Sequence, residues 1–296
     1  LGEQLLENFT LGLYEKALPE ILSWEERLIA AREAGYDFVE MSIDESDPRL
    51  NRLHWTGHQK KVIRAAMERT GMRIQSMSLS AHRRFPLGSP SSHTRERALA
   101  LFNGAIDLAA DLGIRMILVS GADNYYGEST EETRARYLEN LGKGLRKASG
   151  AGVLLGLENW DIQVNSLFKA MKYVRHFNSP WFQLYVDLGN LIYAGFDVLA
   201  ELEHAKGHIA ALHVKDTLPG KLRSVPLGEG GVPFRKAFEK LTSQGFHSPV
   251  VIELWTGEDP EALTIASEAN RFTRSQMTQA RKTVLRNITP TEENKT

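Results

Sequence analysis

The sequence contains no cysteine, and this absence removes several kinds of chemistry at once. It excludes a disulfide bond, a thiolate metal site and a cysteine nucleophile. A chain without disulfides fits a reducing compartment. The N-terminal residues 1–8 are too acidic, and their apolar run is too short, for a signal peptide. We therefore expect a cytoplasmic protein.

The chain also lacks an excess of charge and a long apolar segment. Its formal net charge is -1 and its pI is near 6.8, so it has no basic surface of the kind that binds nucleic acid. No stretch approaches the roughly 20 apolar residues that a membrane helix needs. The remaining interpretation is an enzyme that acts on small molecules, with no nucleic-acid or membrane partner.

What the sequence does contain is a regular alternation of two hydrophobic patterns. Strands are expected at residues 9–14, 37–41, 73–79, 114–119, 152–158, 181–187, 208–213 and 249–253. Amphipathic helices are expected at residues 23–34, 56–69, 94–112, 130–149, 166–177, 198–205, 234–243 and 259–286. Ser23 with Glu26 has the form of a capping box, and Gly35, Gly71 and Gly113 follow helical segments.

Eight βα units predict an α/β fold, a single closed (β/α)₈ TIM barrel formed by residues 1–296 as one domain. Short N- and C-terminal segments, including the polar tail 289–296, are expected to fray. A doubly wound sheet is the alternative, weakened because no Gly-x-Gly-x-x-Gly motif follows the first strand. No linker rich in Pro, Gly or Ser divides the chain, which favours one domain.

Four successive strands of this predicted barrel end in a carboxylate or an imidazole. The residues are Glu158, Asp187, His213 and Glu253. Any one of them alone could be a helix cap or a surface charge. At the ends of four apolar strands they are poor core residues, because burying an unpaired carboxylate is costly. In a (β/α)₈ barrel the active site lies at the C-terminal ends of the strands. We therefore expect the four side chains to surround one half of that opening.

Three carboxylates and an imidazole offer oxygen and nitrogen donors to one divalent metal ion. Mn²⁺, Zn²⁺ and Co²⁺ accept this donor set, and Mg²⁺ is an alternative. The longest interval, between His213 and Glu253, includes residues 217–232, a Gly- and Pro-containing loop that could cover the site.

Basic and glycine-rich segments are expected on the same face of the barrel. One segment follows the third strand, one follows His213, and one lies in the loop after the seventh strand. Their candidate substrate-binding residues are His82, Arg83, Arg84, Lys215, Gly228, Glu229 and Gly230. The backbone N–H groups of residues 227–231 can form an anion-binding nest. Together these features favour a phosphate on the substrate. The alternative is that the arginines are solvated or paired with carboxylates such as Glu229.

Four segments give the sequence a resemblance to a known family. They are residues 11–19, 37–45, 79–89 and 213–217, of which the third reads Leu-Ser-Ala-His-Arg-Arg-Phe-Pro-Leu-Gly-Ser. From about residue 9 into the last helix, the sequence resembles L-xylulose 5-phosphate 3-epimerase, also called L-ribulose 5-phosphate 3-epimerase. That family belongs to the xylose-isomerase-like barrel superfamily, whose sugar epimerases use a Glu-Asp-His-Glu metal site. Its ligands match Glu158, Asp187, His213 and Glu253.

One departure from the family pattern lies next to Glu158. Residues 157–161 read Leu-Glu-Asn-Trp-Asp, where a familiar member has Glu-Ile-Met-Asp. Because Glu158 and Asp161 are kept, we expect a change in the shape of the pocket and not in its chemistry. Asp161 and Asn190 are also expected to bind substrate.

The resemblance implies inversion at C3 of a 2-ketopentose phosphate. The C2 carbonyl makes the C3 proton acidic, and the metal would stabilise the enediolate that forms. Inversion needs a base on one face of the substrate and an acid on the other. Glu158 and Glu253 are the expected pair, while Asp187 and His213 would be ligands only. The resemblance also favours a homodimer.

Other functions stay open. An aldose–ketose isomerase could use the same site for a hydride shift, and a free-ketose 3-epimerase would act without a phosphate. A metal-dependent nuclease would want more histidines and a basic surface, although Glu40 and His82 leave room for a second metal. A sugar-phosphate sensor would keep the basic rim but would not need both glutamates.

Overall fold

The computed structural model describes residues 10–288, and its eight parallel strands close into a barrel in sequence order. The strands are β1 (Leu11–Tyr14), β2 (Phe38–Ile43), β3 (Arg73–Leu79), β4 (Met116–Ser120), β5 (Leu154–Glu158), β6 (Phe182–Asp187), β7 (Ile209–Val214) and β8 (Val250–Ile252). The ring closes where β1 pairs with β8, with Leu11 opposite Val250 and Leu13 opposite Ile252.

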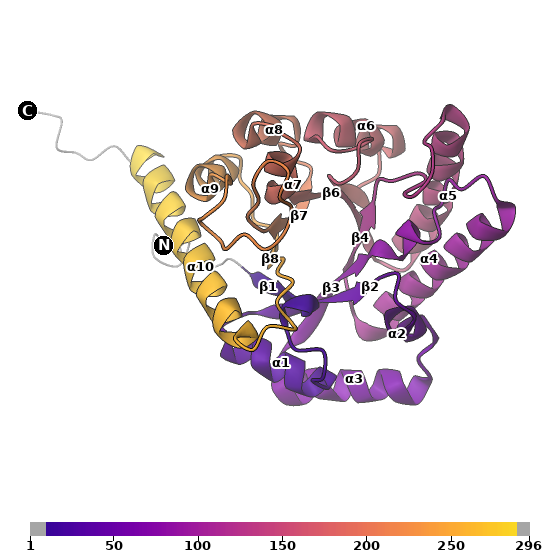
Figure 1. The fold of residues 1–296 in the computed structure, drawn as a ribbon, viewed down its shortest axis with the longest axis horizontal. Coiled ribbons are helices and arrows are strands. Elements are labelled where there is room, and N and C mark those ends of the chain that lie inside the picture. The colour runs from indigo at the N-terminus through magenta and orange to yellow at the C-terminus, as the bar shows by residue number, and fades with distance from the viewer. Residues whose placement is uncertain (1–9, 289–296) are drawn as a thin grey trace, which may run out of the picture.

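Helices surround this barrel, as Figure 1 shows. The seven connections between consecutive strands contain α1 (Trp24–Glu33), α3 (Gly57–Thr70), α4 (Ser92–Leu112), α5 (Glu131–Gly150), α6 (Leu167–Phe177), α8 (Val198–His204) and α9 (Phe234–Ser243), and α10 (Ala262–Ile288) follows β8. Two short helices, α2 (Asp47–Leu50) and α7 (Leu188–Tyr193), follow β2 and β6. None of the helices within residues 10–288 has both the length and the apolar composition needed to cross a membrane.

Local sequence signals explain where several helices begin and end. Ser23 accepts a hydrogen bond from the Glu26 N–H, and the Glu26 side chain accepts one in return from the Ser23 N–H. Thr56 and Gln59 form the same capping box at the start of α3. Gly71 follows α3 with a φ of 70°, a backbone conformation that glycine adopts without steric cost.

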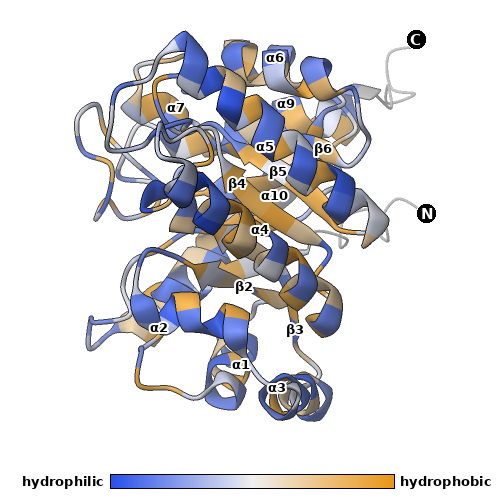
Figure 2. Cartoon of the chain, turned by 90° about the vertical axis from the view of Figure 1, so that its right-hand side faces the viewer, coloured by the Kyte–Doolittle hydropathy of each residue, from blue (hydrophilic) through white to orange (hydrophobic). Residues whose placement is uncertain are grey.

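Side chains of the strands alternate between the barrel interior and the layer beneath the helices. The outer layer is aliphatic and includes Leu13, Val39 and Leu155, each fully buried. In Figure 2 the strands at the centre are largely hydrophobic, whereas the helices carry hydrophilic residues on their outer sides. This apolar layer holds the helices against the barrel.

Large rings fill the barrel interior below its C-terminal opening. Tyr14, Phe38 and Tyr185 belong to a separate cluster of buried side chains. Gly12 makes room for the Phe38 ring, because a Cβ atom there would overlap it, and a Cβ atom at Gly156 would lie only 3.0 Å from the Tyr185 side chain. The polar residues of the strands therefore stand on a closed apolar floor.

The predicted barrel is confirmed, and its predicted strand and helix ranges agree to within three residues at each described end. The strand at residues 73–79 and the helix at residues 234–243 have the predicted bounds. The sequence analysis missed α2 and α7, which are too short to show a hydrophobic period. The frayed terminal segments were predicted for residues that lie outside the described range 10–288.

Candidate metal centre and substrate pocket

The four residues predicted at the strand ends lie together at the C-terminal opening of the barrel. Glu158 and Asp187 are the last residues of β5 and β6, and His213 is the penultimate residue of β7. Glu253 follows β8, and its N–H donates to Val214 O at 2.9 Å. All four are buried, and one potential ligand atom from each lies within 4.8 Å of the others.

His213 presents only one of its two ring nitrogens to this cluster. Its Nε2 is 2.7 Å from Glu40 Oε1, inside the barrel. Its Nδ1 has no hydrogen-bond partner and lies 3.4 Å from Glu158 Oε1 and 3.8 Å from Asp187 Oδ2. Because buried polar atoms are almost always paired, the unpartnered Nδ1 indicates that a ligand belongs between these residues.

Glu40 fixes the orientation of His213. Its Oε2 accepts hydrogen bonds from Ser76 Oγ (2.7 Å) and Tyr185 Oη (2.6 Å), and the side chain is fully buried. A carboxylate held in this way favours a proton on Nε2 of the histidine and leaves Nδ1 for a cation. Burial acts to lower the pKa of His213, but the carboxylates of Glu40, Glu158 and Glu253 together raise that pKa well above its ordinary value. A cation at Nδ1 would therefore displace a proton.

Lys215 balances part of the negative charge of the cluster. Its Nζ is 2.7 Å from Glu253 Oε2 and 2.9 Å from Asp187 Oδ2, the second contact being an ion pair without hydrogen-bond geometry. Burial raises the pKa of Asp187 to about 6, although the Lys215 charge opposes the shift. Burial also acts to raise the pKa of Glu253, but Lys215 and His213 outweigh it and lower that pKa to about 2.

The cluster fits a divalent cation. With Glu158, Asp187 and Glu253 ionised, Lys215 protonated and His213 neutral, two negative charges remain to be neutralised. Asp187 Oδ2, like Nδ1 of His213, is buried without a hydrogen-bond partner. Three oxygen donors and one nitrogen donor suit the metals named from the sequence, and no sulfur ligand is present.

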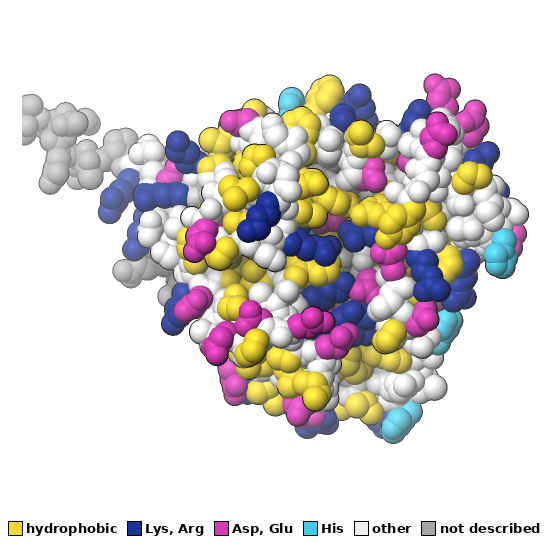
Figure 3. Space-filling model, viewed as in Figure 1, with side chains coloured by type: hydrophobic (Ala, Val, Ile, Leu, Met, Phe, Trp, Pro, Cys, Tyr) yellow, Lys and Arg dark blue, Asp and Glu magenta, His cyan; other side chains and the backbone are white. Residues whose placement is uncertain are grey.

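A pocket opens above the cluster. Its lining includes Glu158 and Glu253 together with serine hydroxyls, aromatic rings and cationic groups, among them Ser78, Ser80, Ser120, Tyr125, Trp160, Trp255, Arg83 and Arg223. Figure 3 shows Lys and Arg side chains gathered around the centre of the face viewed in Figure 1. Asn190 also lines the pocket, and both polar atoms of its buried side chain lack a hydrogen-bond partner. A polyhydroxylated ligand would supply both a donor and an acceptor.

Two arginines stand against aromatic rings in this pocket. The Arg83 guanidinium carbon lies 5.1 Å from the centre of the Tyr125 ring, and its Nε is buried without a hydrogen-bond partner. The Arg223 guanidinium carbon lies 3.6 Å from the centre of the Trp255 ring. Arg223 was missed by the sequence analysis. Its one signal was its position in residues 217–232, the loop expected to cover the site.

Arg84 and His82 lie away from the pocket, contrary to expectation. The Arg84 Nη1 donates to Asp47 Oδ1 at 2.7 Å and is exposed to solvent. His82 is buried against the Phe102 ring, with Nε2 3.2 Å from Ala98 O. Burial lowers the pKa of His82 to about 4, so it is a neutral core residue. The Glu40 oxygens already face three donors, and among the described residues no candidate metal group includes Glu40 or His82.

The glycine loop is not free to bind a phosphate, and this corrects a further prediction. The N–H groups of Gly228 and Gly230 donate to Asp216 Oδ2 at 2.8 and 2.9 Å. The predicted nest therefore does bind an anion, but the anion is a carboxylate of the same chain. Glu229 is exposed in this loop. Lys215 lines the pocket as predicted, and its Nζ contacts the carboxylates of Glu253 and Asp187.

Asp161 is also absent from the described residues that line the pocket. It follows Trp160 with a φ of 85°, and its Oδ1 faces the Gln163 N–H at 3.5 Å. Burial raises its pKa above the ordinary value. It shapes the turn after β5, while Trp160 forms part of the pocket wall.

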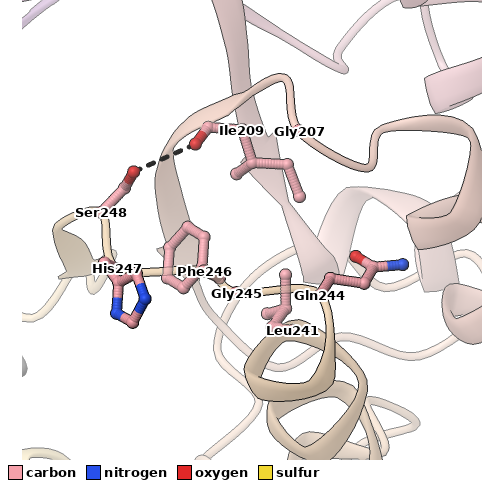
Figure 4. A pocket seen from close by; sticks show the side chains of 8 residues that line it. All are labelled: Gly207, Ile209, Leu241, Gln244, Gly245, Phe246, His247 and Ser248. Atoms are coloured by element: carbon pink, nitrogen blue, oxygen red, sulfur yellow. Dashed lines mark hydrogen bonds between the residues drawn. The ribbon is translucent and has the colours of Figure 1, made fainter.

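A second cavity lies at the other end of the barrel (Figure 4). It is formed around the start of β7 and the segment before β8, and it includes Ile209, Phe246 and His247. The Ser248 hydroxyl donates to Ile209 O at 3.1 Å. No carboxylate, lysine or arginine lines it among the described residues, so it has none of the features of the cluster above.

Comparison with known proteins adds to this geometry. A family profile described as xylose isomerase-like TIM barrel matches residues 28–276. A protein of Escherichia coli O1:K1 / APEC named L-ribulose-5-phosphate 3-epimerase UlaE is 46% identical over 279 residues, which is 93% of this chain and 98% of the relative. The protein of the same name from Salmonella heidelberg is 47% identical over 261 residues, covering 87% of this chain and 92% of the relative.

Solved structures resemble the fold. A structure described as L-ribulose 3-epimerase matches with a TM-score of 0.79 and 21% identity, covering 96% of this chain and 99% of its own. D-Psicose 3-epimerase from Clostridium cellulolyticum H10 matches with a TM-score of 0.77 and 17% identity, covering 91% and 99%. At such identities the likeness supports the barrel fold alone.

Glu40→Ala should lower the affinity for a divalent cation by about 10- to 100-fold, because His213 loses the carboxylate that orients it. The dissociation constant for Zn²⁺ or Mn²⁺ would be measured by competition with a chromophoric chelator. Tyr185→Phe is the matched control, since it removes a hydrogen bond to the other oxygen of Glu40 and should cost less affinity. Unchanged affinity in a folded Glu40→Ala protein would show that His213 does not need this partner.

Proposed function

This chain belongs to the xylose isomerase-like TIM barrel family, and we propose that it interconverts L-ribulose 5-phosphate and L-xylulose 5-phosphate by metal-dependent inversion at C3. It is an epimerase, an isomerase that acts on carbohydrates. The observation that carries the proposal is the position of Glu158 and Glu253. They flank Asp187 and His213 in one buried cluster at the floor of a polar pocket.

The two glutamates suit a proton transfer at C3 from opposite faces. One carboxylate removes the C3 proton, and the electron pair left on carbon delocalises onto the C2 oxygen as an enediolate. The other, protonated, returns a proton to the opposite face. Glu158 ends β5 and Glu253 follows β8, so they approach the pocket from different sides of Asp187 and His213. Lys215 and His213 lower the pKa of Glu253, so its carboxylate is ionised in this cluster.

In this proposal Glu158, Asp187, His213 and Glu253 hold one Mn²⁺, Zn²⁺, Co²⁺ or Mg²⁺ ion. A bound divalent cation would act as a Lewis acid and stabilise the negative charge of the enediolate by several kcal/mol. Asp187 and His213 serve as ligands only, and Asn190 is placed to bind a hydroxyl of the sugar. The homodimer expected from the family resemblance stays a prediction, which light scattering would measure.

The phosphate site of this proposal centres on Arg83. It lines the pocket, its Nε lacks a partner, and a guanidinium binds phosphate through paired hydrogen bonds. The rim is smaller than the sequence suggested, because Arg84, Lys215 and the glycine loop have other partners. That observation favours a second candidate, a free-ketose 3-epimerase with the same two-base chemistry.

The purified protein should epimerise L-ribulose 5-phosphate and L-xylulose 5-phosphate, and prolonged chelation should abolish the activity. Readdition of one divalent ion per chain should restore it, because four donors converge on one position. The assay follows both epimers by chromatography, with metal content from elemental analysis. Absence of activity on both substrates in the metal-loaded protein would refute the proposed function.

Glu158→Gln and Glu253→Gln should each keep the fold and reduce turnover by roughly 10²- to 10⁴-fold, the range for a lost general acid or base. Metal content must be measured in each variant, since both residues are candidate ligands. Glu131→Gln, an exposed glutamate in the first turn of α5, is the control and should retain wild-type turnover. Near-normal turnover in either metal-loaded variant would reject the two-base mechanism.

The protein should prefer the phosphorylated ketose, and Arg83→Ala should remove most of that preference. Each charge-assisted hydrogen bond contributes about 1.5–3 kcal/mol, so two from one guanidinium give a preference on the order of 10³. The measurement compares kcat/KM for L-ribulose 5-phosphate and L-ribulose. Arg84→Ala changes the neighbouring arginine, which points elsewhere, and should leave the ratio unaltered. Equal efficiencies in the unmodified protein would favour the free-ketose epimerase.

A further inference from the structure

We propose that Asp216 is a positioning residue that holds the loop 217–232 closed, so that Arg223 stands over the substrate pocket. The inference rests on the proposed function for the identity of the substrate. Asp216 itself is not among the described residues that line the pocket, and it is buried, with 3% of the residue exposed. It would act through the loop and not by touching the sugar.

The Asp216 carboxylate accepts hydrogen bonds from four backbone N–H groups. Oδ1 accepts from Thr217 (3.0 Å) and Val232 (3.1 Å), and Oδ2 accepts from Gly228 (2.8 Å) and Gly230 (2.9 Å). These donors come from both ends of the loop. One side chain therefore joins the beginning of the loop to its end, and hydrogen bonds to an ionised carboxylate are stronger than those to neutral acceptors.

The backbone of the loop is built around this carboxylate. Gly231 N donates to Thr217 O at 2.8 Å, which closes the same neck. A Cβ atom at Gly230 would overlap Asp216 Oδ1, so only glycine lets the backbone approach this closely. Within the described chain, the loop forms no strand or helix, and its one backbone bridge joins Leu218 and Lys221. The neck therefore provides most of the order of the loop.

The part of the loop held by this neck reaches the pocket. Leu222 and Arg223 both line it, and Arg223 lies against Trp255, which follows Glu253 by two residues. The base of the loop is attached to α7, which follows the neighbouring strand β6, because Thr217 Oγ1 donates to Gly189 O at 2.7 Å, next to the pocket residue Asn190. Loosening the neck would thus remove Arg223 and Leu222 from the pocket while leaving the cluster of four intact.

Asp216→Asn should raise KM by about 10-fold or more and change kcat less, as expected if the closed loop is then only a minor population. The asparagine side chain replaces one carboxylate oxygen with an NH₂ group, which cannot accept the hydrogen bonds that backbone N–H groups donated to that oxygen. Asp197→Asn is the matched control. Asp197 also accepts a backbone N–H, from Ala200 at the start of α8, and lies outside the pocket lining described. It should leave KM unchanged.

A double-mutant cycle with Arg223→Ala separates positioning from a general loss of stability. If Asp216 acts through Arg223, Asp216→Asn should have little further effect on KM in the Arg223→Ala protein. Fully additive effects on log KM would overturn the inference. If Asp216→Asn fails to fold, Gly230→Ala takes its place, because its Cβ disrupts the same neck from the loop side.

Limited trypsin digestion supplies a readout that does not depend on activity. In the metal-loaded protein, cleavage after Lys221 or Arg223, located by mass spectrometry, should be faster in Asp216→Asn than in the unmodified protein or Asp197→Asn. Equal cleavage rates would overturn the inference. If the unmodified protein lacks epimerase activity, the proposed function fails, while digestion still decides whether Asp216 closes the loop.

Discussion

The burial of three carboxylates at one end of the barrel is the constraint on which the rest of the site depends. Parallel strands that close a barrel bring their C-terminal ends together, so Glu158, Asp187 and Glu253 cannot avoid one another. Ionised groups in such a position need compensating charge or must bind protons. Lys215 supplies one positive charge against three carboxylates, and burial still raises the pKa of Asp187 to about 6. The remaining negative charge makes the cluster a candidate site for a cation.

The apolar floor beneath the cluster makes this electrostatic arrangement specific. Tyr185 belongs to that floor and also donates to Glu40, which in turn faces His213. The imidazole is therefore held from inside the barrel by Glu40 of β2, a residue that is far from His213 in sequence. Packing and electrostatics are linked through these contacts, since a ring that fills the barrel also holds Glu40, which orients the His213 nitrogen that faces the candidate metal site.

The gathering of the four cluster residues could be predicted because each stands at the end of its own strand, and the barrel alone then brings them together. The partners of other groups depend on contacts between distant segments, which no local pattern records. Arg83 and Arg84 are adjacent in sequence, yet one lines the pocket and the other pairs with Asp47. His82 was predicted to bind substrate because the sequence does not show that α4 packs over it and buries it.

The partner of the glycine loop could not be predicted from the sequence either. Its N–H groups have the anion-binding character expected of them, but Asp216 occupies them. Residues 213–216 carry three different roles in close succession. His213 belongs to the cluster, Lys215 neutralises it, and Asp216 closes the loop that carries Arg223. Because these residues are neighbours on one rigid strand end, the charge balance of the cluster and the covering of the pocket share a single structural support. A shift of β7 that relaxed the contacts of Lys215 would also move the neck of the loop.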